Sequence, residues 1–207
     1  MNFCITNKIL EGNYSVDGSK YFGYGFPVSS LKQIKSNIKI IKTQHSTSDH
    51  ICYAYRILGK NSIEEYVSDA NEPKGSAGYP ILNVIRQKNI INVIILIVRY
   101  FGGNKLGIRG LIKSYSMASK ITIDSAILEP YIEEIVVVVS HNYKYQKIIQ
   151  HTLKKLNGKI LSQKYSNDIK STVSVPKNKS EKFINQLSDT SKGKITFKLT
   201  YKNLNSY

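Results

Sequence analysis

The sequence predicts an α+β protein of two domains, and three observations support this fold class. Hydrophobic periodicity predicts a β-α-β-β-α-β-α order of elements in residues 1–129. Glu129 precedes Pro130, and a residue before proline is biased away from helix, so a domain break is expected there. Residues 130–207 then follow a β-α-β-β-α-β order, which is the ferredoxin-like arrangement.

In the first domain, a strand is expected at residues 21–28, followed by a helix with Ser29 or Ser30 as its N-cap. Apolar residues at helical spacing carry this helix to Gln44. The other expected elements are strands at 50–58, 62–67 and 90–98, a hairpin turn at 59–61, and helices at 81–88 and 111–128.

In the second domain, the sequence predicts four strands and two helices, of which the first is amphipathic. Gly158 is expected to end the first helix, because glycine adopts the left-handed conformation common after a helix. The strands are expected at 132–140, 159–165, 168–175 and 194–201, and the helices at 145–156 and 180–187.

Residues 97–115 form the most informative stretch, which reads as a strand, a glycine-rich loop and a helix. A loop that opens a helix directs free N–H groups and the positive end of the helix dipole at one point, where anions bind well. The candidate anion- or nucleic-acid-binding residues are Arg99, Gly102, Gly103, Lys105, Gly107, Arg109, Gly110 and Lys113. Tyr100 and Phe101 are candidates to stack on a base, although packing in the core is the simpler interpretation.

A second loop, residues 68–80, carries two carboxylates, Asp69 and Glu72. They could serve acid–base chemistry or a hard cation, together with His50 upstream. The alternative is turn formation and helix capping, because Asp, Asn, Ser, Pro and Gly favour turns. Spacing alone favours the turn, and the three side chains remain the only candidates for catalytic residues.

The net charge of +16 predicts attraction to polyanions such as RNA or the ribosome. Residues 1–130 carry 16 basic and 9 acidic side chains, and residues 131–207 carry 14 and 5. All basic side chains of the second domain are lysines, which suits general attraction more than specific phosphate recognition. A chain rich in Lys, Ile, Asn and Tyr also fits an AT-biased genome, so part of the charge can be compositional.

Composition narrows the class of protein further. The longest apolar run, residues 90–98, is too short to cross a bilayer, and no membrane partner is expected. Residues 1–8 lack the pattern of a signal peptide, so a cytoplasmic protein is expected. Cys4 and Cys52 are expected to be free thiols. No zinc-binding spacing occurs, and no metal or cofactor is expected.

Catalytic motifs are mostly absent. There is no nucleophile elbow, no H-E-x-x-H helix and no complete phosphate-binding P-loop. The four histidines and Cys52 do not combine into a nucleophile, base and orienting group. The residues leave enzymatic activity open and favour a binding protein.

Three ordered motifs resemble those of the YigZ/IMPACT family. Residues 98–115 are similar to its V-R-Y-[YF]-G-G-x-x-L-G-x-G-G-L-x-[KR]-A-Y pattern, and residues 68–80 to S-D-D-G-E-P-x-G-[TS]-A-G-x-P. Residues 50–54 resemble its H-x-C-x-A strand. The resemblance implies that residues 1–129 are the family's N-terminal domain, similar to domain two of ribosomal protein S-five. It also implies that residues 130–207 are a ferredoxin-like domain similar to the fifth domain of elongation factor G.

The sequence departs from the family pattern at two places. Ala70 and Asn71 replace an Asp and a Gly in the acidic motif, and Asn tolerates the positive φ that this turn would need. Arg109 stands where the family pattern has a glycine, which adds a cation to the loop.

The favoured hypothesis is a cytosolic protein of this family that binds RNA or the ribosome and modulates translation. The eukaryotic branch of the family is linked to translational regulation through an extra N-terminal domain, which this chain is expected to lack. One alternative is an enzyme that acts on a phosphorylated small molecule, using the glycine loop with Asp69, Glu72 and His50. A second alternative is a scaffold for another protein, and homo-oligomers are compatible with every hypothesis.

Overall fold

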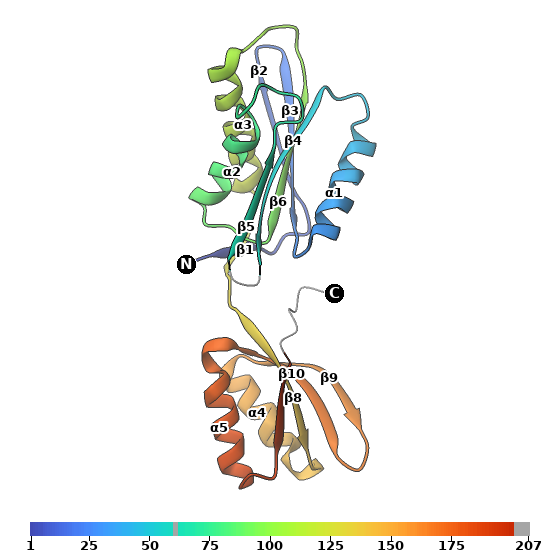
Figure 1. Ribbon diagram of the computed structural model, residues 1–207, viewed down its shortest axis with the longest axis vertical. Coiled ribbons are helices and arrows are strands. Elements are labelled where there is room, and N and C mark those ends of the chain that lie inside the picture. Colours follow the sequence, from blue (N-terminus) through green and yellow to red (C-terminus); the bar gives the residue numbers. More distant parts are fainter. Residues whose placement is uncertain (60–61, 201–207) are drawn as a thin grey trace. The chain divides into compact units, whose positions relative to one another are not determined.

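A computed structural model describes residues 1–59 and 62–200 of the chain. It divides into two compact units, Met1–Tyr131 and Ile132–Tyr207, and each combines helices with an antiparallel sheet (Figure 1). The two-domain α+β fold class is thereby confirmed. The expected turn at Lys60 and Asn61 lies outside the described residues, as does Tyr201.

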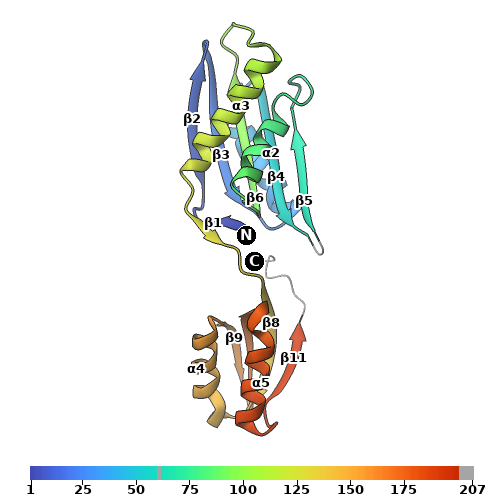
Figure 2. The same cartoon turned by 90° about the vertical axis from the view of Figure 1, so that its left-hand side faces the viewer.

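A five-stranded sheet organises the first unit, with β6 (Val93–Tyr100) in its centre. Its order is β2-β3-β6-β4-β5, with β2 Leu10–Val16, β3 Ser19–Pro27, β4 His50–Leu58 and β5 Ile63–Ser68. Helices α2 (Gly78–Gln87) and α3 (Gly107–Asp124) cover one face, and α1 (Leu31–Gln44) packs on the other (Figures 1 and 2).

Burial on both faces explains the continuous apolar run of β6. Ile95 and Ile97 belong to the core under α2 and α3. Leu96 and Val98 belong to the core under α1. Side chains of a strand alternate between faces, so a strand covered on both sides needs apolar residues at every position.

The β2–β3 hairpin was not expected from the sequence. Its turn is Asp17-Gly18, with φ of 46° and 80°. Asp-Gly is the preferred dipeptide of such two-residue turns, so the signal was present but lay between strands of weak periodicity.

The first unit also extends slightly beyond the expected break at Glu129-Pro130. Strand β1 (Phe3–Ile5) pairs with β7 (Leu128–Pro130), so Pro130 belongs to a strand of the first unit. The boundary between the two units falls two residues after the expected break, between Tyr131 and Ile132.

Local sequence signals predicted the start of α1 but not the start of α3. Ser30 caps α1, since its side chain accepts the backbone N–H of Gln33. Helix α3 begins at Gly107, four residues before the expected Leu111, and ends at Asp124. The glycines at its start were interpreted as loop, although a helix can begin with them when its next turns pack on a sheet.

The second unit has the ferredoxin-like βαββαβ order expected from the sequence. Helices α4 (Gln146–Leu156) and α5 (Ser180–Ser191) supply Ile149, Leu153, Phe183 and Leu187 to a core against the sheet. Asn157 (φ 60°), rather than the expected Gly158, takes the left-handed position that ends α4. The elements are β8 Glu134–His141, η1 Tyr143–Tyr145, α4 Gln146–Leu156, β9 Lys159–Tyr165, β10 Ile169–Pro176, η2 Lys177–Lys179, α5 Ser180–Ser191 and β11 Thr196–Thr200, with sheet order β11-β8-β10-β9.

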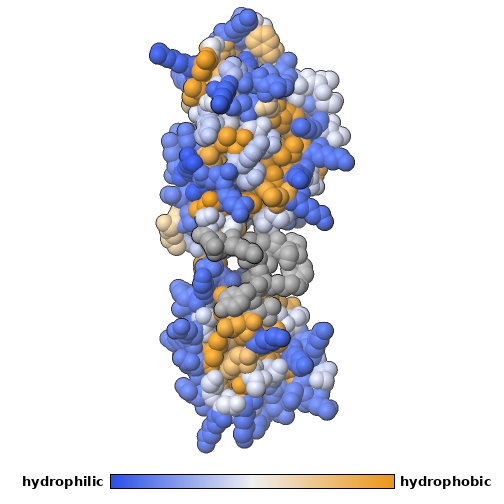
Figure 3. Space-filling view, viewed as in Figure 1, coloured by the Kyte–Doolittle hydropathy of each residue, from blue (hydrophilic) through white to orange (hydrophobic). Residues whose placement is uncertain are grey.

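On the visible face of each unit, hydrophobic side chains gather between margins of hydrophilic ones (Figure 3). Among the described residues, no helix has both the length and the apolar content needed to span a membrane.

Candidate functional site

Three side chains from three strands stand at one level of the first unit's sheet. In the strand register, Arg99 of β6 lies opposite Tyr21 of β3 on one side and His50 of β4 on the other. Residues directly opposite in neighbouring strands point to the same face. All three therefore face the layer of α2 and α3.

Glu72 binds to this row from the loop before α2. Its Oε1 accepts a hydrogen bond from Nη1 of Arg99 at 2.6 Å and one from Oη of Tyr115 at 2.8 Å. Nε2 of His50 lies 3.9 Å from the same oxygen. Glu72 is 8% exposed and Arg99 is 5% exposed. The sequence placed these residues in separate motifs, and the fold brings them into one buried charge pair.

Arg99 also connects the acidic loop to the glycine loop. Its Nη2 donates to Oγ of Ser19 at 3.4 Å, and the backbone N–H of Gly102 donates to the same Oγ at 3.3 Å. The guanidinium carbon lies 5.4 Å from the centre of the Phe101 ring. The guanidinium of Arg99 is therefore buried and bonded within the protein, which differs from the phosphate contact expected of Arg99 from the sequence.

The carboxylate of Asp69 holds the start of α2. It accepts the backbone N–H groups of Gly75, Ala77 and Gly78 at 2.8, 3.0 and 2.8 Å. This arrangement corresponds to the capping interpretation of Asp69. Asn71 has φ of 71°, so the turn keeps a positive φ although asparagine replaces the family's glycine.

His50 and Cys52 face the same loop through its backbone carbonyls. Nδ1 of His50 lies 2.9 Å from the carbonyl oxygen of Ala70, and Sγ of Cys52 lies 2.9 Å from that of Asp69. Burial raises the pKa of Cys52 to about 12 and raises the pKa of Tyr115 above its ordinary value of 10. The thiol is protonated at neutral pH, which makes it a poor nucleophile.

The glycines of the loop do two different things. A Cβ on Gly102 would come within 1.9 Å of the carbonyl carbon of Gly18, so Gly102 permits close packing of the loop on the β2–β3 turn. Gly103 and Gly107 have φ of 87° and 66°, and a Cβ on either would meet nothing within 4 Å. Their backbone faces open space, where a ligand can approach.

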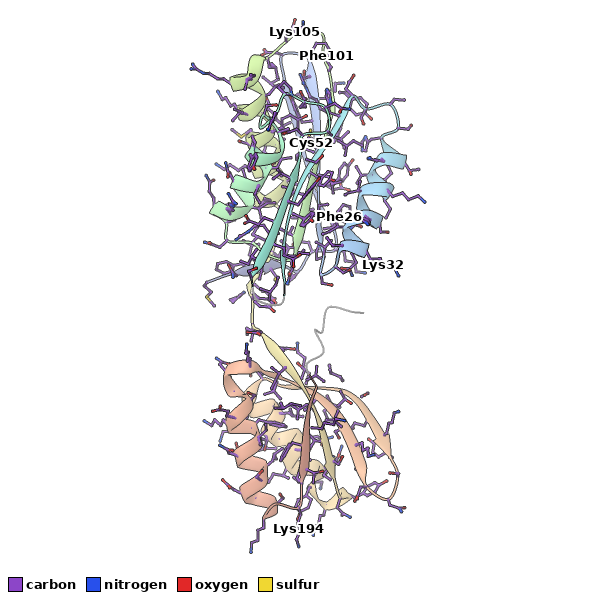
Figure 4. All side chains as sticks on the ribbon, in the orientation of Figure 1. Phe26, Lys32, Cys52, Phe101, Lys105 and Lys194 are labelled. Atoms are coloured by element: carbon purple, nitrogen blue, oxygen red, sulfur yellow. The ribbon has the colours of Figure 1, made fainter. Side chains whose placement is uncertain are left out.

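The remaining candidate cations lie on the glycine loop and on the first two turns of α3. Lys105, Arg109 and Lys113 are exposed, and Lys105 lies at the end of the first unit (Figure 4). The N-cap residue Leu106 provides no side-chain hydrogen bond, and the first turn contains no acidic residue. Gly110 lies within this turn and packs beside Leu106. The helix start therefore combines free N–H groups with positive side chains, which suits a phosphate.

Tyr100 and Phe101 have different environments. Tyr100 points to the α1 face, where its Oη lies 2.9 Å from Nδ1 of His45 and its ring packs edge-on against Phe22. Phe101 is 45% exposed and lies at the same end of the unit as Lys105 (Figure 4). Of the two residues, Tyr100 therefore packs against the core, whereas Phe101 remains exposed.

Residues 17–123, just over half of the 207-residue chain, match the Impact N-terminal domain family. The chain belongs to the IMPACT family. Residues 148–194 match a second family, described as a domain of unknown function, DUF1949.

Two bacterial IMPACT family members are similar over most of their length. The member YvyE of Bacillus subtilis is 27% identical over 195 residues, which cover 92% of this chain and 89% of YvyE. The member YigZ of Escherichia coli is 25% identical over 166 residues, covering 80% and 81%. A solved structure described as a hypothetical protein superposes with a TM-score of 0.69 at 21% identity over 97% of this chain and 98% of its own, which indicates a shared fold.

In this IMPACT family member, the described residues contain no group of three or more His, Cys, Asp or Glu side chains able to hold a metal ion. Tyr115 and Ser19 were not singled out as site residues from the sequence, although both bind the central charge pair. Fifteen tyrosines occur in the chain, and only the packing of α3 on the sheet selects the one that meets Glu72.

Proposed function

We propose that this IMPACT family member binds RNA, most directly ribosomal RNA, and modulates translation. One observation carries the proposal: exposed Lys105, Arg109 and Lys113 surround a helix start that has neither a side-chain cap nor an acidic residue. Net charge of +16 adds long-range attraction to any polyanion. The family resemblance to ribosomal and elongation-factor domains supports translation as the setting.

In this proposal, the buried cation has a structural role and the exposed cations bind the ligand. Arg99 is paired with Glu72 and holds the two loops together. Lys105, Arg109 and Lys113 remain to contact phosphates from the surface. Arg109, which replaces a glycine of the family pattern, contributes a planar fork of donors that matches phosphate oxygens.

Salt dependence tests the proposal. The protein is sedimented with ribosomes, and its affinity for a ribosomal RNA fragment is measured at several salt concentrations. In the triple variant Lys105→Gln, Arg109→Gln and Lys113→Gln, we expect weaker binding and a slope of log affinity against log salt that is reduced by about 3, because each phosphate contact adds about one unit.

A matched control removes the same number of charges elsewhere. Lys32, Lys35 and Lys39 are exposed on α1 (Figure 4 labels Lys32), and their triple Gln variant should retain the steeper slope. Absence of binding to ribosomes and RNA at low salt would overturn the proposal. Equal losses in the two triple variants would show general attraction without a site at the glycine loop.

A second candidate is an enzyme acting on a phosphorylated small molecule. It is favoured by the half-buried His50, whose Nε2 lies 3.9 Å from Oε1 of Glu72. The bonds of Glu72 to Arg99 and Tyr115 leave His50 as the more accessible titratable group of the set. Specific stabilisation by inorganic phosphate or small phosphate esters in thermal melts, lost in His50→Ala, would support this candidate. If the chain instead binds another protein, with an affinity that does not depend on salt and with no RNA in the complex, the scaffold hypothesis would be supported.

A further inference from the structure

We propose that a hollow beside the glycine loop receives one unpaired nucleobase of the bound RNA. The inference rests on the RNA-binding proposal and gives it a preference for single strands. The hollow has a volume of about 410 Å³. It is lined by Gly18, Lys20, Phe22, His45, Tyr100 and Phe101.

The inner wall of the hollow is aromatic and fixed in place. Phe22 stacks on His45 with ring centroids 5.7 Å apart and 30° between the planes. Phe22 also meets Tyr100 edge-on at 5.8 Å and 88°. Rings held this way offer a preformed apolar surface, so little conformational entropy is lost when a planar ligand binds.

His45 is held in place by hydrogen bonds to two tyrosines. Its Nε2 lies 2.8 Å from Oη of Tyr24, and its Nδ1 lies 2.9 Å from Oη of Tyr100. Both ring nitrogens are therefore satisfied within the protein. Burial lowers the pKa of His45, which favours the neutral ring at pH 7. The wall presents a ring without adding a charge that would distinguish one base from another.

Phe101 also lines the hollow, beside these packed rings. It is 45% exposed, yet its backbone is held because its N–H donates to Oδ2 of Asp49 at 2.8 Å. The guanidinium of Arg99 lies 5.4 Å from the ring centre. A solvent-exposed aromatic on a fixed backbone is the stacking platform used by proteins that bind single-stranded nucleic acid.

The hollow adjoins the cationic loop through the backbone. Gly18 of the hollow packs against Gly102, and Nδ2 of Asn104 donates to the carbonyl oxygen of Asp17 at 3.4 Å. Exposed Lys20 adds a positive charge within the hollow. Asp17 and Asp49 carry negative charge nearby, and Asp49 is already bonded to the backbone of Phe101.

This juxtaposition of rings and cations fits a nucleotide whose phosphate contacts the loop and whose base enters the hollow. A base inside a duplex is stacked and paired, so it reaches such a hollow only after unstacking, which costs free energy. The hollow is therefore expected to favour unpaired RNA.

The test compares Phe101→Ala with Tyr79→Ala, which removes an exposed ring from α2 on the other face of the sheet. Fluorescence anisotropy measures binding of labelled oligo-uridine and of a duplex RNA of equal length at low salt. Phe101→Ala should weaken single-strand binding by roughly 5- to 150-fold and leave duplex binding within about twofold, because one stacking contact is lost. Tyr79→Ala should change neither.

Phe101→Leu is a second variant that keeps apolar bulk and removes the ring, which guards against a folding defect. Unchanged single-strand binding in both Phe101 variants would overturn the inference, and so would equal losses for duplex and single strand. The RNA-binding proposal is tested separately by the triple loop variant. If the unaltered protein binds neither RNA, both proposals fall.

Discussion

Oε1 of Glu72 and Nη1 of Arg99 lie 2.6 Å apart in the interior of the first unit. The pair joins the loop before α2 to the end of the central strand, and Tyr115 of α3 donates to the same oxygen. Removing two charges from water costs free energy that their attraction only partly offsets, so the pair by itself is no source of exceptional stability. Its role is to hold two loops in one arrangement.

Loss of one partner should nevertheless be severe. Glu72→Ala leaves the guanidinium of Arg99 buried without its carboxylate, and the free energy of unfolding should fall by about 3–5 kcal/mol. Urea denaturation measures this change. The control is Asp124→Ala, which removes an exposed pair with Lys88 (3.0 Å) and should cost about 1 kcal/mol or less. Equal effects of the two changes would contradict a structural role for the buried pair.

Gly102→Ala and Gly103→Ala should differ although they are neighbours. The new Cβ at position 102 would lie 1.9 Å from the backbone of Gly18, and we expect a loss of about 3 kcal/mol or more. At position 103 the space is open, so only the backbone strain at φ of 87° applies, about 1–2 kcal/mol. Thermal melts of both variants provide the comparison, and the reverse order would show that the loop does not pack on the β2–β3 turn.

The two thiols should react at different rates. Burial raises the pKa of Cys52 to about 12, while Cys4 is partly exposed and the pKa of its thiol is also raised by burial. Iodoacetamide at pH 8 should modify Cys4 slowly and leave Cys52 intact in the folded protein. Peptide mass spectrometry reads the positions, with the urea-unfolded chain as the control in which both react. Faster modification of Cys52 than of Cys4 would indicate an activated thiol.

Acid stability should depend on Glu65, which pairs with Arg86 and Arg56. Hydrogen bonds from Arg86 are the largest cause of a Glu65 pKa below its ordinary value of 4.5. A pKa that is lower in the folded state adds stability above about pH 4.5, and this stability is lost as the pH falls through the lower folded value.

The corresponding experiment follows the unfolding free energy of the unaltered protein and of Glu65→Gln from pH 7 to pH 3. The difference between the two proteins should be largest at neutral pH and should shrink as the pH falls. A difference that stays constant across this range would mean that the carboxylate charge of Glu65 does not contribute.

Local patterns predicted much of the fold. Apolar residues at helical spacing and a cap at Ser29 or Ser30 placed α1 correctly, and the order of elements in the second unit predicted its ferredoxin-like sheet. The short strands β1 and β7 were not predicted from the sequence. A strand of three residues has too few positions to show a hydrophobic period, and it forms only where a partner strand is available.

The sequence by itself determined the two-domain α+β class, the family motifs and the positive charge at the glycine loop. Only the tertiary structure decided that Arg99 turns inward to Glu72 while Lys105 and Arg109 stay at the surface, and that Phe101 is exposed while Tyr100 packs. Arg99 and Tyr100 are adjacent on β6 and face opposite sides of the sheet, and what covers each side depends on segments far away in the chain. Spacing identifies the chemical groups of a site, whereas burial and partners follow from packing.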